Sequence, residues 1–345
     1  MGFILGILFV SFAVHAIALV PFINFLYKIK LQRQKQETKD AFNLPTPIFD
    51  KFHRNKAGIP IGGGFLVILI TAILFLLSFP VLYYFWIPIT SIYSNKAAEL
   101  KVLLFTFIAF GMIGLYDDIK KVFFGASERF FGLRLRHKLI LEIILAVIAS
   151  FWLFAELKIE IINIPLLGVF DLGIFYIFFA AFVIISFANA FNITDGLDGL
   201  ATGILMIALS AFCVISHSIL DTPLSLFIAI WLGGLIAFLY FNIYPARIFL
   251  GDVGALSFGA TFAVIGLLLG KTFSLIVIGG IFVAEIASSF IQLISKKYWK
   301  RKVLKAAPLH LLLQEKGWHE ATIVFRGWLV GIMLAIIGLW WAFIS

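Results

Sequence analysis

The chain has 345 residues, of which 62% are hydrophobic and 13% charged, whereas about a quarter of residues are charged in soluble domains. This composition excludes an ordinary soluble domain. An open β-sheet exposed to lipid is excluded as well, because nothing in hydrocarbon would satisfy its backbone hydrogen-bonding groups. The net charge of +9 suggests nucleic-acid binding only until its placement along the chain is considered.

Long apolar runs recur along the whole chain. A bilayer core about 30 Å thick is crossed by about 20 apolar residues of α-helix. We predict about ten membrane-spanning helices, at residues 3–27, 63–88, 102–116, 139–155, 172–190, 199–217, 224–241, 254–271, 273–295 and 324–345. The run 102–116 is short, so a count of eight or nine helices also fits. The sequence therefore predicts an all-α, polytopic integral membrane protein.

Basic residues are shared unevenly among the predicted connections. Of the 27 lysines and arginines, 23 lie in four of them, at 28–56, 120–138, Arg247 and 296–326. Such a bias is typical of cytoplasmic loops. With ten helices, it places both termini on the extracytoplasmic side. It also accounts for the positive charge without a nucleic-acid partner, although some attraction to anionic membrane lipid is expected.

We interpret residues 1–345 as one transmembrane domain, because no soluble domain, low-complexity segment or internal repeat interrupts the apolar runs. The first run is too long for a cleaved signal peptide, and its positive charges follow it. Cys213 is the only cysteine, so no intramolecular disulfide can form. The cytoplasmic loops expected to carry an active site are 28–62, 117–138, 189–199, 242–254 and 296–326.

These predicted cytoplasmic connections hold an acidic set and one notable histidine: Asp117, Asp118, Asp195, Asp198, Asp252 and His310. Each has a plain structural interpretation, as a solvated helix end, an aspartate that caps a helix, or a surface histidine. Their gathering on one membrane face, with glycines close to the aspartates, favours a functional interpretation, since ionisable groups at membrane depth are costly. Acids on the opposite face lack a comparable polar context.

The chemistry that this set suits is metal-assisted phosphoryl transfer. Mg²⁺ prefers oxygen ligands and commonly binds one or two carboxylates together with substrate phosphates. No second histidine or cysteine is arranged for a zinc site, and GIPIGGG lacks the ending of a nucleotide-hydrolysing P-loop. Lys121 and Lys138 lie close to the carboxylates and could neutralise phosphate oxygens. Positioning and charge neutralisation are most of what phosphoryl transfer requires.

Five segments in order resemble a known enzyme family. The chain is similar to the polyprenyl-phosphate N-acetylhexosamine-1-phosphate transferases in GLYDDIKK, NAFNITDGLDGLATG, FNIYPARIFLGDVGALSFG and KAAPLHLLLQEKGW. More narrowly, it resembles the phospho-N-acetylmuramoyl-pentapeptide transferases in PIFDKFHRNKAGIPIGGG and in the pairing of APLH with EKGWHEATIVFRGW. The likeness runs from about residue 47 to 330.

The resemblance implies a ten-helix enzyme, usually a homodimer, in the bacterial cytoplasmic (inner) membrane with its active site facing the cytoplasm. The implied reaction joins undecaprenyl phosphate to the phospho-sugar of UDP-N-acetylmuramoyl-pentapeptide, with Mg²⁺. Its products would be UMP and lipid I, an intermediate of peptidoglycan synthesis. Because the acceptor cannot leave lipid and the charged donor cannot enter it, such a reaction has to occur at the membrane boundary.

Because these motifs match those of the family, the resemblance also implies roles for individual residues. The resemblance implies catalytic roles for Asp117, Asp118, Asp195 and His310. It implies metal binding by Asp252, which matches the most direct metal ligand, and by Asp195. Substrate binding is implied for Lys56, Lys121, Lys138, Asn189, Asn192 and Asp198.

The chain also departs from the family pattern. Where the muramoyl enzymes usually carry three consecutive histidines, it has His310, Leu311 and Leu312. Other departures replace the usual threonines, methionine and glutamine, and they are Ile59, Ile61, Gly62 and Glu142. They put contacts to the sugar and peptide of the donor in question more than the phosphate chemistry, because every aspartate is kept.

Alternatives remain at this point. We expect direct attack by the lipid phosphate, deprotonated or oriented by Asp117 or Asp118, since an oriented phosphate is an adequate nucleophile. A two-step route through an aspartyl-phosphate is also chemically allowed. UDP-N-acetylglucosamine is an alternative donor. An ion-coupled transporter is a remote alternative, because transporter sites lie near the bilayer midplane, often between inverted repeats.

Overall fold

The computed structural model describes residues 2–32, 47–124, 133 and 135–344. In this part of the chain, nine helices are long and apolar enough to cross a membrane. They are α1 (Gly2–Lys28), α3 (Gly63–Tyr84), α4 (Lys96–Ile119), α5 (Leu135–Ala155), α6 (Phe175–Thr194), α7 (Leu200–Ser218), α8 (Thr222–Asn242), α9 (Gly251–Leu268) and α13 (Glu320–Ile344). The predicted all-α polytopic fold is confirmed.

A tenth span depends on a broken helix. The apolar run 273–295 folds as α10 (Thr272–Ile278) and α11 (Gly280–Ile294), and the axis bends by 78° between α10 and the helical segment that extends to Trp299. The break falls at Gly279, where an added Cβ would lie 2.7 Å from the Phe187 ring. Close packing against α6 therefore requires glycine at the bend. When the bent pair is counted as one span, the described residues hold up to ten spans, the number expected from the sequence.

The predicted short helix 102–116 is longer than its apolar run. It begins six residues earlier, where the Asn95 side chain accepts a hydrogen bond from the Ala98 backbone and caps α4. At its other end α4 continues into a π-helical turn, η2 (Lys120–Phe124). The predicted helix is too short because the prediction counted only apolar residues, whereas both ends of this helix carry charged residues.

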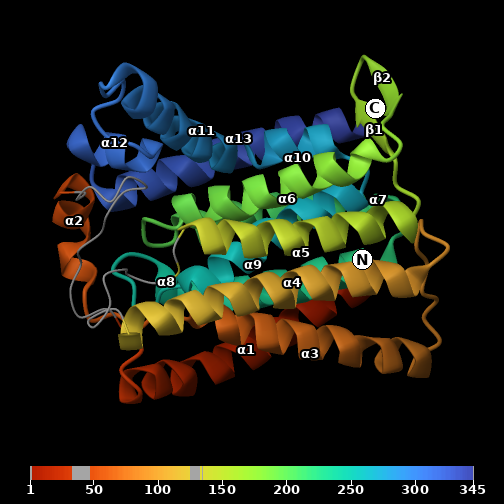
Figure 1. Cartoon of the computed structure of the whole chain (residues 1–345). Helices are drawn as coiled ribbons and strands as arrows, with labels where there is room; N and C mark the ends of the chain where they lie inside the picture. Colours follow the sequence, from red (N-terminus) through yellow and green to blue (C-terminus); the bar gives the residue numbers. More distant parts are fainter. Residues whose placement is uncertain (1, 33–46, 125–132, 134, 345) are drawn as a thin grey trace.

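The helices form an antiparallel bundle whose two ends differ (Figure 1). One end carries α2 (Pro47–His53), η1 (Arg54–Lys56), α12 (Leu309–Glu315) and η3 (Ser295–Trp299); the other carries the antiparallel hairpin of β1 (Ile161–Ile164) and β2 (Gly168–Asp171). The hairpin was not predicted. We call the end with α2 and α12 the polar end, because the acidic set lies there.

Both chain termini lie at the hairpin end. The last residues of α1 pack near the segment before α3, where the Ile61 backbone N–H donates to the Leu31 carbonyl at the polar end. The first residue of α13, Glu320, also lies at the polar end, so α13 finishes opposite (Figure 1). This agrees with two termini on one side of a membrane. That this side is extracytoplasmic remains a prediction.

Helices α8 and α9 form the centre of the bundle. Almost all of α9 is buried, with α4 and α6 packed along it, while α8 packs against α1, α3 and α7. The core that joins α4, α8 and α9 contains a cluster of aromatic rings in edge-to-face and stacked contacts, formed by Phe107, Phe227, Trp231 and Phe258. The two helices that carry Asp117 and Asp252 are therefore held rigidly side by side.

Candidate active site

Asp117 and Asp252 lie close together at the polar end, although they are 135 residues apart in the sequence. Lys121 Nζ lies 2.9 Å from Asp117 Oδ2 and 2.6 Å from Asp252 Oδ2. Lys138 Nζ lies 2.7 Å from the same Asp252 oxygen and 3.4 Å from Asp117 Oδ2. Two ammonium groups and two carboxylates from α4, η2, α5 and α9 thus form one cluster, which we call the phosphate cluster.

Asp118, the second member of the predicted pair, makes no ion pair with Lys121 or Lys138 in the described part of the chain. Its Oδ2 accepts a 3.0 Å hydrogen bond from the Val253 backbone N–H in the first turn of α9. Its Oδ1 is buried and has no hydrogen-bond partner among the described residues. A carboxylate facing a helix N-terminus is favourably placed for charge. Asp118 therefore fastens α4 to α9 and keeps one oxygen available.

Glycines allow this close approach. A Cβ on Gly114 would lie 2.1 Å from the Asp252 carbonyl oxygen, and a Cβ on Gly251 would lie 2.5 Å from Asp118 Oδ2. Gly251 also has a φ of +77°, a conformation that L side chains rarely adopt. The glycine before Asp252 and the glycine one turn before Asp117 are therefore what bring the carboxylates within reach of the same lysines.

Asn189 lies near this cluster but is occupied by another side chain. Its Nδ2 donates to Glu142 Oε2 at 2.6 Å and to the Ile185 carbonyl at 3.0 Å. Glu142 Oε1 and Asn192 Nδ2 are buried and lack partners within the described part of the chain. The Glu142 carboxylate therefore holds Asn189 in place.

Lys56 is the centre of a second charged cluster. Its Nζ lies 2.6 Å from Asp198 Oδ1 and 2.6 Å from Glu320 Oε1, and it donates to the Gly196 carbonyl at 3.3 Å. Asp198 Oδ2 in turn accepts from the Ala246 backbone. The geometry joins η1, the α6–α7 connection and α13 through one ammonium group. The implied substrate-binding roles of Lys56 and Asp198 are untested, and both residues also hold the fold.

His310 is buried and oriented by a residue that the sequence reasoning missed. Its Nδ1 lies 3.1 Å from Glu285 Oε2, and its backbone N–H donates to Glu285 Oε1 at 3.1 Å. The other ring nitrogen, Nε2, has no partner among the described residues and faces Gly196, where a Cβ would lie 2.5 Å away. An acid within the apolar run 273–295 was the available signal.

Asp195 lies between the clusters but in neither. Among the described residues it makes no ion pair, and its side chain is half-buried. Burial raises the pKa of its carboxyl well above the ordinary value; the negative charges of Asp252 and Asp198 add to the increase, and Lys56 opposes it. The structure therefore places Asp195 near Asp252 without bringing the two into contact, and its implied metal-binding role stays a prediction.

The acidic set offers oxygen atoms of the kind that bind a metal ion. No three acidic, histidine or cysteine side chains of the described residues are arranged to hold a metal ion by themselves. The oxygen donors nevertheless fit Mg²⁺, which needs only one or two carboxylates when substrate phosphates supply other ligands. Asp252, Asp117 and the unpartnered oxygen of Asp118 are the residues that would hold it.

Comparison with known proteins gives one consistent picture. A profile of "Glycosyl transferase family 4" matches residues 100–270. A phospho-N-acetylmuramoyl-pentapeptide-transferase of Caldanaerobacter subterraneus is 35% identical over 94% of this chain and 93% of its own length. Proteins of the same name from Clostridium novyi and Bacillus mycoides are 34% and 33% identical, covering 83% and 94% of this chain and equal shares of their own.

The matched regions contain the geometry described above. The profile covers Asp117, Lys138, Asp195 and Asp252, and the longer alignments cover nearly the whole chain, from the helical bundle to its polar end. Identity above 30% over more than nine-tenths of both sequences is ample for shared ancestry and a shared fold. The chain belongs to the phospho-N-acetylmuramoyl-pentapeptide-transferase family, the bacterial multi-pass membrane phospho-sugar transferases.

Proposed function

We propose that this protein transfers phospho-N-acetylmuramoyl-pentapeptide from its UDP-linked donor to undecaprenyl phosphate, releasing UMP and forming lipid I in peptidoglycan synthesis. The observation that carries the proposal is the phosphate cluster, in which Lys121 and Lys138 each face both Asp117 and Asp252 at one end of a membrane bundle. Family membership names the reaction, and the cluster supplies groups suited to bound phosphates.

Each member of the cluster has a task in the transfer. Lys121 and Lys138 bind oxygens of the donor diphosphate and of the lipid phosphate, which replace part of their present pairing with carboxylates. Asp117 is almost completely buried. It deprotonates or orients the lipid phosphate, so that a phosphate oxygen attacks the sugar-linked phosphorus. The bond to UMP then breaks. Mg²⁺ bound at Asp252 would supply charge neutralisation on the diphosphate oxygens.

His310 acts at the α6–α7 connection, where its ring faces Gly196. Its Nδ1 faces the Glu285 carboxylate, so the neutral ring is expected to carry its proton there and to keep Nε2 as an acceptor towards Gly196. We propose that Nε2 accepts a hydrogen bond from the donor or from a water held beside it. Leu311, which replaces the second histidine of the family pattern, is buried and serves packing.

The cellular setting belongs to the proposal as well. We place the polar end at the cytoplasmic face of the inner membrane, because the basic loops lie at that end and both substrates can meet only at a lipid–water boundary. A homodimer is proposed from the family resemblance. Parts of the predicted loops 28–62 and 117–138 lie outside the described residues.

Transfer of a radiolabelled phospho-sugar to undecaprenyl phosphate tests the function. The purified protein is given UDP-N-acetylmuramoyl-pentapeptide or UDP-N-acetylglucosamine, each with Mg²⁺ or with EDTA. We expect lipid-linked label and UMP only with the muramoyl donor and Mg²⁺. Label from UDP-N-acetylglucosamine alone would replace the proposed donor, and transfer that continues in EDTA would remove the metal. Ion flux into liposomes without UMP release would favour a transporter.

A further inference from the structure

The carboxylate of Glu320 joins the start of α13 to two other segments at the polar end. Its Oε1 accepts a 2.8 Å hydrogen bond from the Asp198 backbone N–H, and the same oxygen lies 2.6 Å from Lys56 Nζ. Glu320 is buried, and along the sequence it is 122 residues from Asp198 and 264 from Lys56. A carboxylate in the first turn of a helix is also stabilised by the positive end of the helix dipole. One oxygen of α13 therefore fixes both η1 and the α6–α7 connection.

A second side chain of α13 holds the same connection. Trp328, about two helical turns after Glu320, donates from its indole Nε1 to the Gly199 carbonyl at 3.2 Å. The ring packs so closely on α7 that a Cβ on Gly203 would lie 2.1 Å from this nitrogen. The backbone N–H of Asp198 and the carbonyl of Gly199 are therefore both bonded to α13, one at each end of this two-residue stretch.

The α6–α7 connection also determines the surroundings of two candidate site residues. Gly196 lies against the His310 ring, where a Cβ would be 2.5 Å from Nε2, and its carbonyl accepts from Lys56 Nζ at 3.3 Å. Asp195 precedes it and lies close enough to Asp252 for the two negative charges to interact. A displacement of about 1 Å is enough to impair a positioned group, so a shift of this connection would affect both the aspartate and the histidine.

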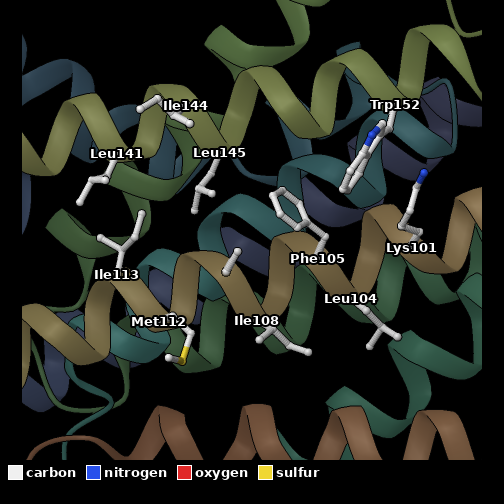
Figure 2. Close-up of a pocket in the computed structure, with 11 residues that line it drawn as sticks. Lys101, Leu104, Phe105, Ile108, Met112, Ile113, Leu141, Ile144, Leu145 and Trp152 are labelled. Atoms are coloured by element: carbon white, nitrogen blue, oxygen red, sulfur yellow. The ribbon is translucent and has the colours of Figure 1, made fainter.

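The pocket of about 660 Å³ between α4 and α5 is lined almost entirely by apolar side chains (Figure 2). Phe105 and Ile113 on α4 point towards α5, and Leu145 and Trp152 on α5 point towards α4. Among the described residues that line this pocket, Lys101 is the one with a charged side chain, and it lies over the Trp152 ring. Such a lining does not suit a charged sugar nucleotide, whereas the α6–α7 connection and its partners offer polar groups.

We propose that Glu320 is a positioning residue for binding of the UDP-linked donor. The inference rests on the proposed function and adds a residue that acts through Lys56 and through the backbone of the α6–α7 connection. Glu320 and Trp328 hold this connection in place before the donor binds, with Asp195 near the phosphate cluster. The donor then meets a segment that is already ordered, so less of its binding energy is used to order the protein.

Binding of the acceptor is expected not to depend on Glu320. The proposed ligands of its phosphate, Lys121 and Lys138, lie on η2 and α5 and are paired with Asp117 and Asp252. In the described part of the chain, neither lysine forms an ion pair with Glu320. An effect confined to the KM of the donor therefore indicates positioning, whereas general loosening of the site would alter the kinetics with both substrates.

Kinetics of variants at position 320 test the proposal. In Glu320→Ala we expect the KM for UDP-N-acetylmuramoyl-pentapeptide to rise about tenfold, while kcat and the KM for undecaprenyl phosphate change by less than about twofold. Glu320→Gln keeps an oxygen that can accept from the Asp198 N–H, and should bring the donor KM to within about threefold of wild type. The control Glu315→Ala, at an exposed position of the same end, should change none of these constants. Equal losses in Glu320→Gln and Glu320→Ala would overturn the proposal, because the charge itself would then be required.

Hydrogen exchange provides a measurement that does not depend on turnover. Amide exchange is followed by mass spectrometry in detergent, without donor, for wild type, Glu320→Ala and Trp328→Phe, which keeps an aromatic ring and loses the N–H donor. We expect exchange in residues 194–199 to be at least about fivefold faster in both variants, and exchange in residues 251–268 of α9 to be unchanged. Faster exchange throughout the chain, with a lower melting temperature and a wild-type donor KM, would show a merely structural role and contradict positioning.

Trp328→Phe decides the question if Glu320→Ala does not fold. The same changes in the donor KM and in exchange of residues 194–199 are expected, about threefold in size, because one of the two hydrogen bonds from α13 remains. A folded Trp328→Phe protein with wild-type exchange and a wild-type donor KM would then overturn the proposal.

The two hypotheses fail in different ways. If the wild-type protein released no UMP, the proposed function would be wrong, while faster exchange of residues 194–199 in the variants would still show that α13 holds the connection. If UMP were released normally and the donor KM and exchange of Glu320→Ala matched wild type, the function would stand and the positioning role of Glu320 would be wrong.

Discussion

At the scale of single residues, the Lys56 ammonium and the His310 ring at the polar end are each fixed by buried carboxylates. The Glu285 carboxylate accepts from the His310 backbone N–H and faces the His310 Nδ1, and the Lys56 ammonium is paired with the carboxylates of Asp198 and Glu320. Lys56, Asp198 and His310 were candidates from the sequence, whereas Glu285 and Glu320 were not. Which side chains meet, as Lys56 and Glu320 do, is decided by the packing of helices.

Glu285 is expected to act through His310. Glu285→Ala removes the group that fixes the ring, so we predict a fall in kcat of about tenfold to 100-fold, within what a positioned acid or base contributes. Glu285→Gln, which can still accept the backbone hydrogen bond, should recover part of it. In the double variant with His310→Ala, the loss should match that of His310→Ala alone. Additive losses measured by UMP release would show that the two residues act separately.

Lys56 is expected to be needed for stability as well as for any contact with substrate. In Lys56→Met the carboxylates of Asp198 and Glu320 stay buried without their counterion, which costs about 3–5 kcal/mol in comparable cases. We predict a clear drop in melting temperature in detergent, whereas Lys51→Met, at an exposed position of the same segment, should leave it unchanged. An unaltered melting temperature with a raised donor KM would make Lys56 a substrate ligand alone.

At the scale of elements, hydropathy predicted the membrane helices well and their irregularities poorly. The bend at Gly279 and the hairpin of β1 and β2 depend on what neighbouring helices allow, and neither leaves a periodic signal in the sequence. The gathering of the aspartates was predictable because alternation of spans sends every second connection to the same side. Which aspartates touch was not predictable, since it depends on the separation of α4 and α9.

Gly114 sets that separation. In Gly114→Ala the new methyl group would lie 2.1 Å from the Asp252 carbonyl oxygen, so α4 and α9 must move apart. This movement would increase the distance between the Asp117 and Asp252 carboxylates. We predict a loss of UMP release of about 100-fold and a lower melting temperature, as for other overpacked cores. Gly6→Ala is the matched control, because its Cβ would meet nothing within 4 Å. Normal activity in Gly114→Ala would mean that this spacing is unimportant.

At the scale of the whole molecule, charge is distributed between two unlike ends. The polar end pairs lysines with aspartates around a site, whereas at the hairpin end Asp221 caps α8 by accepting from the Leu224 backbone and is almost completely buried. Burial raises the pKa of the Asp221 carboxyl, and hydrogen bonds from Leu224, Glu99 and the Ile92 backbone oppose part of the increase. We therefore expect the hairpin end to give the bundle a pH-dependent stability that is separate from catalysis.

The sign of that dependence follows from the raised pKa. The folded protein keeps the proton on Asp221 at a pH where the unfolded chain has lost it, so stability is greatest below the unfolded value of about 4 and declines as pH rises through the folded pKa. Asp221→Asn keeps the cap without the charge. We predict a flatter decline as pH rises above about 4, with a melting temperature about 3 °C above wild type at pH 7. A parallel pH profile would contradict this account.

We propose that carboxylates from separate helices form a single phosphate-transfer site at the polar end. Its most direct test is UMP release from UDP-N-acetylmuramoyl-pentapeptide by the Asp252→Asn variant, with undecaprenyl phosphate and Mg²⁺, in protein whose melting temperature and elution volume match wild type. We predict a rate about 100- to 1,000-fold below wild type. A folded Asp252→Asn protein that turns over at close to the wild-type rate would contradict it.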